Sequence, residues 1–299
     1  MRYLIYKSTN LLDSILLDDH EECVYIRITD DDLKSRIFNR LIQYARIHKL
    51  FFPFLLKIIH GFSKLRKITA DDIVIVFDIA DTTLIEYIHK CIPQTHRFNV
   101  FFWNPMSKTF EDPQKAIQRL SKIGCHISTF DKKDSEMYHL IYKNQFIKKI
   151  YLSILPTKFD FYFLGAPKGR ESTLHSIIQR LKEIGKVGIC IVPHSKEKFI
   201  PYERNVQYVL QSICIIEIVQ EGQEGLTLRA LEALVYGKKL ITTVRNIVNY
   251  DFYNPNNILI WNNQTNDELT RFFNTNYTII DQKIIDKYSF HNWIQSYSK

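Results

Sequence analysis

Two glutamates, Glu224 and Glu232, have seven residues between them in the segment 220–232, which reads Q-E-G-Q-E-G-L-T-L-R-A-L-E. The first lies in a glycine-containing loop, and the second lies in a run of apolar residues at helical spacing. A helix that begins at such a loop presents unpaired backbone N–H groups, here near Leu226 to Arg229, and these groups attract anionic oxygens such as those of a diphosphate. The two carboxylates could then accept hydrogen bonds from hydroxyl groups on either side of that diphosphate.

A second candidate site is the loop 165–170, G-A-P-K-G-R, which follows a predicted strand at 159–164. Its glycines permit a close approach of the backbone, and Lys168 and Arg170 supply a point charge and a planar fork of donors for a departing diphosphate. The alternative is a loop with two solvated basic residues. In a parallel sheet the two loops would lie at the same edge, so we expect them to converge on one anion.

These loops need a parallel sheet to bring them together, and the sequence predicts two such sheets. Strands are predicted at 3–6, 23–28, 72–77, 98–103, 126–130, 159–164, 187–192, 213–219, 239–243 and 258–261, and helices at 31–48, 51–66, 82–92, 113–123, 171–184, 202–211, 226–235 and 291–297. Such alternation is typical of α/β domains. A segment near residue 150 that contains proline and lysines separates two sets of strands, which predicts domains at 1–150 and 151–299.

The composition fits a compact, two-domain cytoplasmic protein. The chain has 299 residues, 45% of them apolar, and its five cysteines are scattered without a C-x-x-C pair, which favours reduced thiols over a disulfide framework or a zinc site. No secretion signal is recognised at the N-terminus. The longest apolar run of the basic N-terminal region, Leu50–Leu56, is far shorter than the ~20 residues that a membrane helix needs.

The net charge of +8 suggests an anionic partner. Basic side chains between Arg36 and Lys67 are interleaved with large apolar ones, which fits a helical hairpin on an anionic membrane surface better than a protein that reads a nucleic-acid duplex. The alternative is that the apolar half of this segment is core. The sequence contains no P-loop and no RNA-binding aromatic motif, so nucleic acid is not expected as a partner.

Several acidic residues elsewhere have both a functional and a structural interpretation. Asp78 and Asp81 follow a predicted strand, where a carboxylate could act as a base on an acceptor hydroxyl, although Asp81 also suits the N-cap of the next helix and capping is preferred. The acidic triplet 30–32 is interpreted as the start of a helix rather than a metal site. Glu217, in a strand that is apolar on both faces, is expected either to pair with a cation such as Arg229 or to be a working residue of the site, and the pair is preferred.

The two candidate loops together resemble a known family. E-G-L-T-L-R-A-L-E, from Glu224 to Glu232, is similar to the E-x7-E motif of retaining GT-B glycosyltransferases. A closer resemblance, over roughly 159–261, is to small bacterial proteins of capsule and lipopolysaccharide biosynthesis. It depends on F-L-G-A-P-K-G-R at 163–170, Q-E-G-L-T-L-R-A-L-E at 223–232 and Y-D-F-Y-N-P-N-N-I at 250–258.

The resemblance implies a fold of two Rossmann-like domains that face each other across a cleft. Residues 1–150 would bind the acceptor, and residues 151–299 would bind a nucleotide-sugar and end in a helix that crosses back to the first domain. The implied acceptor is a lipid-linked or oligosaccharide precursor of a surface polysaccharide or lipopolysaccharide, at the inner, anionic face of the cell membrane. The implied reaction retains anomeric configuration and needs neither metal nor cofactor.

The resemblance also implies roles for individual residues. Lys168 and Arg170 would stabilise the leaving diphosphate, Glu232 would hold the ribose, and Gln223 or Glu224 would orient the donor sugar. The other expected site residues are Asp81 as a catalytic carboxylate and Gly165, Gly225, Leu226 and Thr227 in the donor pocket. Two other functions stay open: a sugar-nucleotide epimerase on the same scaffold, and a basic protein without enzymatic activity that binds membranes or nucleic acid.

Overall fold

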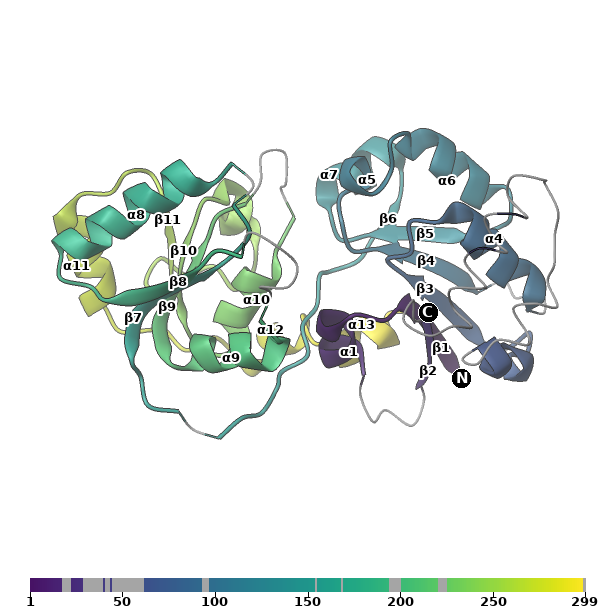
Figure 1. The fold of residues 1–299 in the computed structure, drawn as a ribbon, viewed down its shortest axis with the longest axis horizontal. Helices are drawn as coiled ribbons and strands as arrows, with labels where there is room; N and C mark the ends of the chain where they lie inside the picture. Colours follow the sequence, from purple (N-terminus) through teal and green to yellow (C-terminus); the bar gives the residue numbers. More distant parts are fainter. Residues whose placement is uncertain are drawn as a thin grey trace. The chain divides into compact units, whose positions relative to one another are not determined.

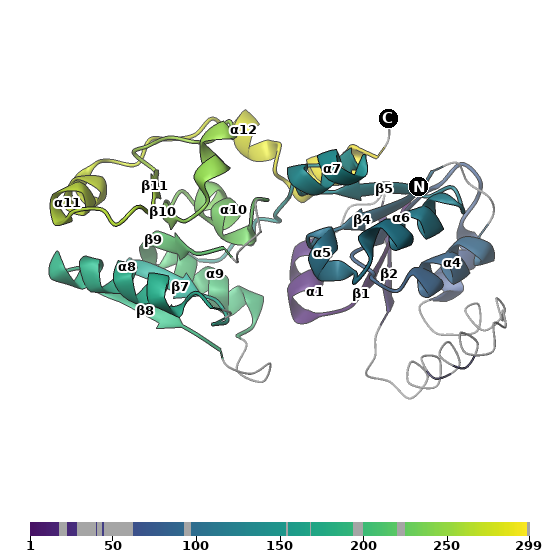
Figure 2. The ribbon, with the colours of Figure 1, turned by 90° about the horizontal axis from the view of Figure 1, so that it is seen from above.

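The computed structural model describes residues 1–17, 23–28, 62–92, 97–153, 155–167, 169–193, 200–219 and 225–297, together with positions 40 and 44. Figure 1 and Figure 2 show two compact units, each with a sheet covered by helices. Unit 1 comprises Met1–Lys143 and Tyr297–Lys299, and unit 2 comprises Asn144–Ser296.

Unit 1 is built on a six-stranded parallel sheet in the order β2-β1-β3-β4-β5-β6. Its strands are β1 (Arg2–Lys7), β2 (Cys23–Ile28), β3 (Ile73–Phe77), β4 (Phe98–Phe102), β5 (His126–Thr129) and β6 (Ile141–Tyr142). Its helical segments are α1 (Asn10–Leu16), η1 (Phe62–Lys67), α4 (Thr82–Cys91), α5 (Met106–Thr109), α6 (Pro113–Ser121) and α7 (Lys132–Tyr138). β3 is buried along its whole length because helices cover both faces of the sheet.

Unit 2 is built on a five-stranded parallel sheet in the order β11-β10-β9-β7-β8. Its strands are β7 (Phe159–Leu164), β8 (Gly188–Ile191), β9 (Ser212–Glu217), β10 (Lys239–Thr242) and β11 (Ile258–Ile260). Its helical segments are α8 (Glu171–Glu183), α9 (Tyr202–Leu210), α10 (Leu228–Val235), η3 (Arg245–Asn249), α11 (Asn266–Asn274), α12 (Gln282–Asp286) and α13 (Phe290–Gln295).

The two faces of the unit 2 sheet bury different side chains of β7. Phe161 and Phe163 pack with apolar residues of α8 and α11, whereas Tyr162 packs on the opposite face with residues of α9 and α10. Successive side chains of a strand point to opposite faces, so one aromatic strand supplies both cores. Helices therefore cover both faces of the unit 2 sheet.

Both sheets place their first strand inside, their second strand on one side of it and their later strands on the other. The direction of winding therefore reverses between β1 and β3 in unit 1 and between β7 and β9 in unit 2. In open parallel sheets, ligands bind beyond the carboxyl ends of the strands at this topological switch point. The loops after β1, β3, β7 and β9 are thus the places where function is expected.

The predicted α/β class with two Rossmann-like domains is confirmed. β2 and β7 have the predicted bounds, and the other predicted strands differ by a residue or two at their ends. Helices α1, α5, α7, α11 and α12 were not predicted, although α11 begins with a capping box between Thr265 and Glu268 that the sequence displays. The triplet 30–32 and most of the basic segment 36–67 lie outside the described residues. The cleft between the domains stays a prediction.

The final helix of unit 2 packs on the segment that opens the unit. Ile147 donates its backbone N–H to the carbonyl of Tyr288 (2.8 Å) and accepts from the backbone N–H of Phe290 (3.2 Å), while the Phe146 and Trp293 rings lie 4.5 Å apart. Within the described part of the chain, no helix has the length and apolar character needed to span a bilayer.

Candidate functional site

The first turn of α10 is capped by a threonine. Thr227 has an extended backbone, and its hydroxyl accepts a hydrogen bond from the backbone N–H of Arg229 (3.0 Å). This cap satisfies one amide of the first helical turn, and the partial positive charge of the helix N-terminus favours an anion there. The predicted helix over 226–235 is present and begins at Leu228, while residues 220–224 of the preceding loop lie outside the described residues.

Thr227 is itself fixed by a buried carboxylate. Glu217, the last residue of β9, is 2% exposed and accepts hydrogen bonds from the hydroxyls of Thr227 and of Thr242 at the end of β10. Burial raises the pKa of Glu217, and the two hydroxyls and the nearby Arg229 oppose that shift. The expectation that Glu217 forms an ion pair with Arg229 is wrong, because the ion pair of Arg229 is with Glu232.

Arg170 ends the loop after β7 and directly precedes α8. Its guanidinium donates to the carbonyl oxygens of Ala166 (2.7 Å), Pro167 (3.4 Å) and Ile218, which follows β9. The guanidinium thus spans the gap between the β7 loop and the end of β9.

Gly165 makes this position of Arg170 possible. A Cβ atom on Gly165 would lie 3.0 Å from Nη2 of Arg170 and 2.9 Å from Cζ of Phe163, so a larger residue would displace the guanidinium. Burial, together with the neighbouring Arg229 guanidinium, lowers the pKa of Arg170. The two guanidinium groups lie at the same end of β7, because Arg229 bonds Leu164 and Arg170 lies against Gly165.

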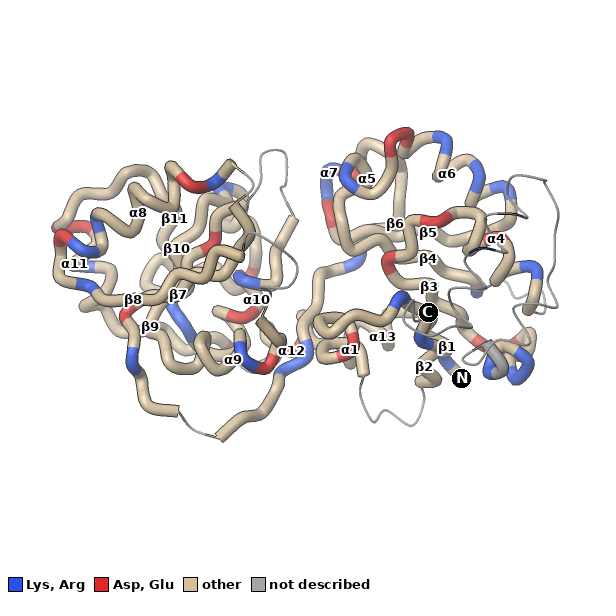
Figure 3. The backbone as a smooth tube through the Cα atoms, viewed as in Figure 1, with Lys and Arg blue, Asp and Glu red and all other residues tan. Residues whose placement is uncertain are grey.

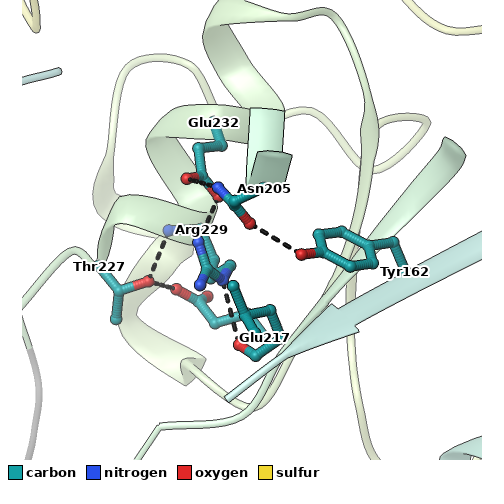
Figure 4. A network of polar contacts seen from close by, with 7 residues as sticks. Tyr162, Asn205, Glu217, Thr227, Arg229 and Glu232 are labelled. Atoms are coloured by element: carbon teal, nitrogen blue, oxygen red, sulfur yellow. Dashed lines mark hydrogen bonds and ion pairs between the residues drawn. The ribbon is translucent and has the colours of Figure 1, made fainter. Parts of the chain in front are cut away.

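Arg229 lies in the first turn of α10 and reaches back to β7, as Figure 4 shows. Its Nε donates to the carbonyl of Leu164 (3.3 Å), and its Nη1 donates to Oε2 of Glu232 (2.6 Å). Oε1 of Glu232 accepts from Nδ2 of Asn205 (2.7 Å), whose Oδ1 accepts from the hydroxyl of Tyr162 (2.9 Å). Burial alone would lower the pKa of Arg229, but the Glu232 carboxylate raises it above its usual value.

The two arginines cross-link the topological switch point of unit 2. Arg170 comes from the loop after β7 and bonds the residue after β9, whereas Arg229 comes from the helix after β9 and bonds the last residue of β7. Figure 3 shows basic and acidic residues interspersed along the described parts of both units. Two forks of donors beside a helix N-terminus suit a ligand with several anionic oxygens, such as a diphosphate.

The structure brings most of the predicted unit 2 residues into this cluster. Gly165, Arg170 and Thr227 lie at the switch point, and Gly225 and Leu226 are buried directly before the Thr227 cap. The other predicted residues are Glu232, which has no exposed surface and faces Arg229 and Asn205, and Lys168, Gln223 and Glu224, which lie outside the described residues. The proposed roles of these residues on a ligand stay predictions.

Asp81 belongs to unit 1, where it is the N-cap of α4. Its Oδ1 accepts from the backbone N–H groups of Thr83 (2.9 Å) and Leu84 (3.1 Å), which confirms the capping interpretation. Its expected catalytic role stays a prediction.

Among the described residues, no cluster of His, Cys, Asp and Glu side chains is arranged to hold a metal ion.

Asp78 follows β3 directly and has a left-handed backbone, with φ of 50°. Its carboxylate accepts from the backbone N–H of Trp103 (3.0 Å) and from Nδ2 of Asn104 (2.9 Å), so it joins the ends of β3 and β4. Burial raises the pKa of Asp78, and these two donors oppose that shift.

Sequence reasoning missed the partners of both buried glutamates in unit 2. Arg229 precedes Glu232 by three residues, a helical spacing at which side chains meet, so that pair was readable from the sequence. Asn205 comes from α9 and Tyr162 from β7, and no local pattern signals either contact. Thr242 reaches Glu217 only because β10 lies beside β9 in the sheet.

No protein-family model and no curated protein matches this sequence. Solved structures do match. The OtsA apo structure superposes with a TM-score of 0.57 at 10% identity, over 99% of this chain and 98% of OtsA. TarM has a TM-score of 0.53 at 11% identity over 86% of this chain, and the chain spans only 56% of TarM. An α,α-trehalose-phosphate synthase (UDP-forming) from Burkholderia vietnamiensis has a TM-score of 0.51 at 10% identity, over 99% of this chain and 96% of the synthase.

The chain has the GT-B fold. These similar structures are GT-B glycosyltransferases, and a likeness of this extent at such low identity establishes the fold and not the reaction. In unit 2, the half in which the sequence resembles GT-B enzymes, the switch point carries the arginine pair. In this chain, two arginine side chains therefore lie at the place where doubly wound sheets bind ligands.

Proposed function

We propose that this chain is a glycosyltransferase that transfers a sugar from a nucleotide-sugar held by unit 2. The observation that carries the proposal is the convergence of Arg170, Arg229 and the N-terminus of α10 at the β7/β9 switch point. A similar structure is described as bound with UDP-2-fluoro glucose, which supports the same class of donor.

The chemistry that these groups supply is stabilisation of a leaving diphosphate. Negative charge develops on the diphosphate as the bond from the sugar to its oxygen breaks, and donors already held in place stabilise that charge without reorganising. Arg170 is held by three backbone carbonyls, and the amides near Thr227 are held by the Glu217 contact. Lys168, from the same loop as Arg170, would add a further cation.

The remaining assignments follow the sequence resemblance. Gln223 or Glu224 would orient the donor sugar beside Gly225 and Leu226. Unit 1 would bind the acceptor, with Asp81 near the carboxyl end of its sheet. The resemblance over 159–261 supports an acceptor from surface-polysaccharide or lipopolysaccharide synthesis, retention of configuration, catalysis without a metal or cofactor, and a place at the inner face of the membrane.

A ligand that binds only the native state raises its apparent stability, so thermal unfolding is a direct screen. UDP, GDP, ADP and CDP, each at ~1 mM, which is about 100 times a Kd of ~10 μM, should include one that stabilises the protein by about 2.7 kcal/mol. The corresponding nucleotide-sugars are then incubated with lipid-linked and oligosaccharide acceptors, and products are identified by mass spectrometry. Failure of all four diphosphates to shift the transition would refute the proposal, and a sugar isomer formed without acceptor would indicate an epimerase instead.

A further inference from the structure

We infer that Arg229 is a diphosphate-binding cation of this site in addition to Arg170 and Lys168, and that Glu232 is the positioning residue that orients it rather than a ligand of the ribose. The inference rests on the proposed function, because it assigns residues within the same site. It departs from the sequence-based expectation, in which the two glutamates contact the nucleotide-sugar and Arg229 is a structural counterion.

Arg229 lies where a bound anion would gain from it: in the first turn of α10 and close to Arg170. A cation in the first turn of a helix opposes the helix dipole. Arg229 also lies near a second cation, because its Nε donates to the carbonyl of Leu164, and a Cβ atom on the next residue, Gly165, would lie 3.0 Å from Nη2 of Arg170. Burial and the Arg229 guanidinium together lower the pKa of Arg170. A diphosphate bound beside both guanidinium groups would relieve their repulsion and would also meet the N–H groups of α10.

Glu232 is not placed to meet a ribose. It has 0% exposed surface, and its two oxygens accept from Arg229 and from Asn205. Asn205 is oriented in turn by the hydroxyl of Tyr162, which is also fully buried. The hydrogen bonds from Tyr162 through Asn205 and Glu232 therefore end on one guanidinium and hold it in a single orientation.

That orientation leaves part of the arginine fork available. Nε and Nη1 of Arg229 are engaged by Leu164 and Glu232, whereas Nη2 has no hydrogen-bond partner among the described residues. The Arg229 side chain keeps 21% of its surface exposed, although its partner Glu232 keeps none. A guanidinium that is fixed on one edge and open on the other is arranged to donate to a phosphate oxygen.

The test separates contacts to phosphate from contacts to ribose. Affinities of wild type, Arg229→Lys and Glu232→Gln are measured by titration calorimetry for the best-binding diphosphate of UDP, GDP, ADP and CDP, for its monophosphate and for its nucleoside. Lysine keeps the charge beside Glu232 but loses the fork, so Arg229→Lys should weaken diphosphate binding about tenfold or more and leave nucleoside binding unchanged. Glu232→Gln should give the same phosphate-dependent loss.

A matched control is the exposed pair Arg180–Glu183, which has the same spacing on α8. Arg180→Lys should bind all three ligands as wild type does. If a single variant fails to fold, the double variant Arg229→Gln/Glu232→Gln removes both buried charges and should show the same loss. In wild type, phenylglyoxal modification of Arg229, mapped by mass spectrometry, should be suppressed by the diphosphate and not by the nucleoside.

The possible results are distinct. Equal losses for nucleoside and diphosphate in Glu232→Gln would make Glu232 a ribose ligand and overturn the inference. Wild-type diphosphate affinity in Arg229→Lys, or Arg229 labelling that the diphosphate does not affect, would also overturn it while leaving the proposed function intact. A wild-type protein that binds none of the four diphosphates would refute the proposed function, and the inference with it.

Discussion

In unit 2 the switch point between β7 and β9 carries two guanidinium groups, whereas in unit 1 the switch point between β1 and β3 carries a carboxylate. The topology of the two places is the same, because the first five strands of each unit follow the same order in the sheet. Asp78 follows β3 directly, and α1, the helix after β1, adds a second acid, Asp13, which accepts from the hydroxyls of Ser8 (2.6 Å) and Tyr6 (2.7 Å).

Strand order sets where a parallel sheet can bind a ligand, and at that place the two units carry side chains of opposite charge. Guanidinium groups donate hydrogen bonds and suit phosphate oxygens, whereas carboxylates accept hydrogen bonds and suit hydroxyl groups. A donor diphosphate in unit 2 and a hydroxyl-bearing acceptor in unit 1 would match this division. The following predictions test it, beginning with the largest effect.

Arg170→Met should lower kcat/KM for the nucleotide-sugar by about 10²–10³-fold, the usual cost of removing one donor to developing negative charge. The measurement is steady-state transfer at saturating acceptor, with thermal unfolding to confirm the fold. Arg180→Met, on the exposed face of α8, is the control and should retain wild-type kinetics. Near-normal turnover by a folded Arg170→Met protein would show that the Arg170 guanidinium at the unit 2 switch point does not stabilise the leaving diphosphate.

Asp78→Ala should destabilise unit 1 by about 2–3 kcal/mol, since alanine disfavours the left-handed backbone and the donors of Trp103 and Asn104 lose their acceptor. Asp78→Gly should cost less, because glycine adopts the left-handed backbone readily and only the loss of the two hydrogen bonds remains as a cost. Urea unfolding measures both. Diphosphate affinity should stay unchanged in both variants, and a loss of affinity would show that the two switch points do not act separately.

Glu217→Gln should alter the pH dependence of stability. The pKa of Glu217 is raised in the folded state by burial, so wild type loses stability as pH rises from the unfolded pKa, about 4.3, through the folded pKa. Glutamine does not titrate. The stability advantage of wild type over Glu217→Gln should therefore shrink as pH rises, which urea unfolding from pH ~4 to ~8 would record. An advantage that grows with pH would mean that the folded pKa is lowered.

Asp81→Ala and Asp81→Asn give the smallest expected effects and separate a cap from a base. Alanine should cost about 1 kcal/mol of stability, whereas asparagine caps nearly as well as aspartate and should cost little. If Asp81 only caps α4, the transfer rate of Asp81→Asn stays at the wild-type level. A large loss of kcat in a fully stable Asp81→Asn protein would instead support the catalytic role predicted from the sequence.

Much of the fold was predictable because it depends on local patterns. β7 and β2 were predicted with their observed bounds from apolar, β-branched and aromatic runs, and Asp81 was recognised as a cap from its place between a strand and a helix. α11 was missed although its capping box is visible in the sequence, and α1 is short. The contact between Arg229 and Glu232 was also local, because the two residues are three apart in a helix, but it was not predicted.

The sequence by itself determined the elements, their alternation and the two loops with their cations and glycines, since these depend on residues close together in the chain. Only the tertiary structure decided which polar groups meet: Glu217 with Thr242, Glu232 with Asn205, and Arg170 with Ile218. Those partners come from different strands and helices, and a buried carboxylate takes whichever donors the packing brings to it. The charge of each switch point is therefore set by side chains, while its position is set by the order in which the strands are wound.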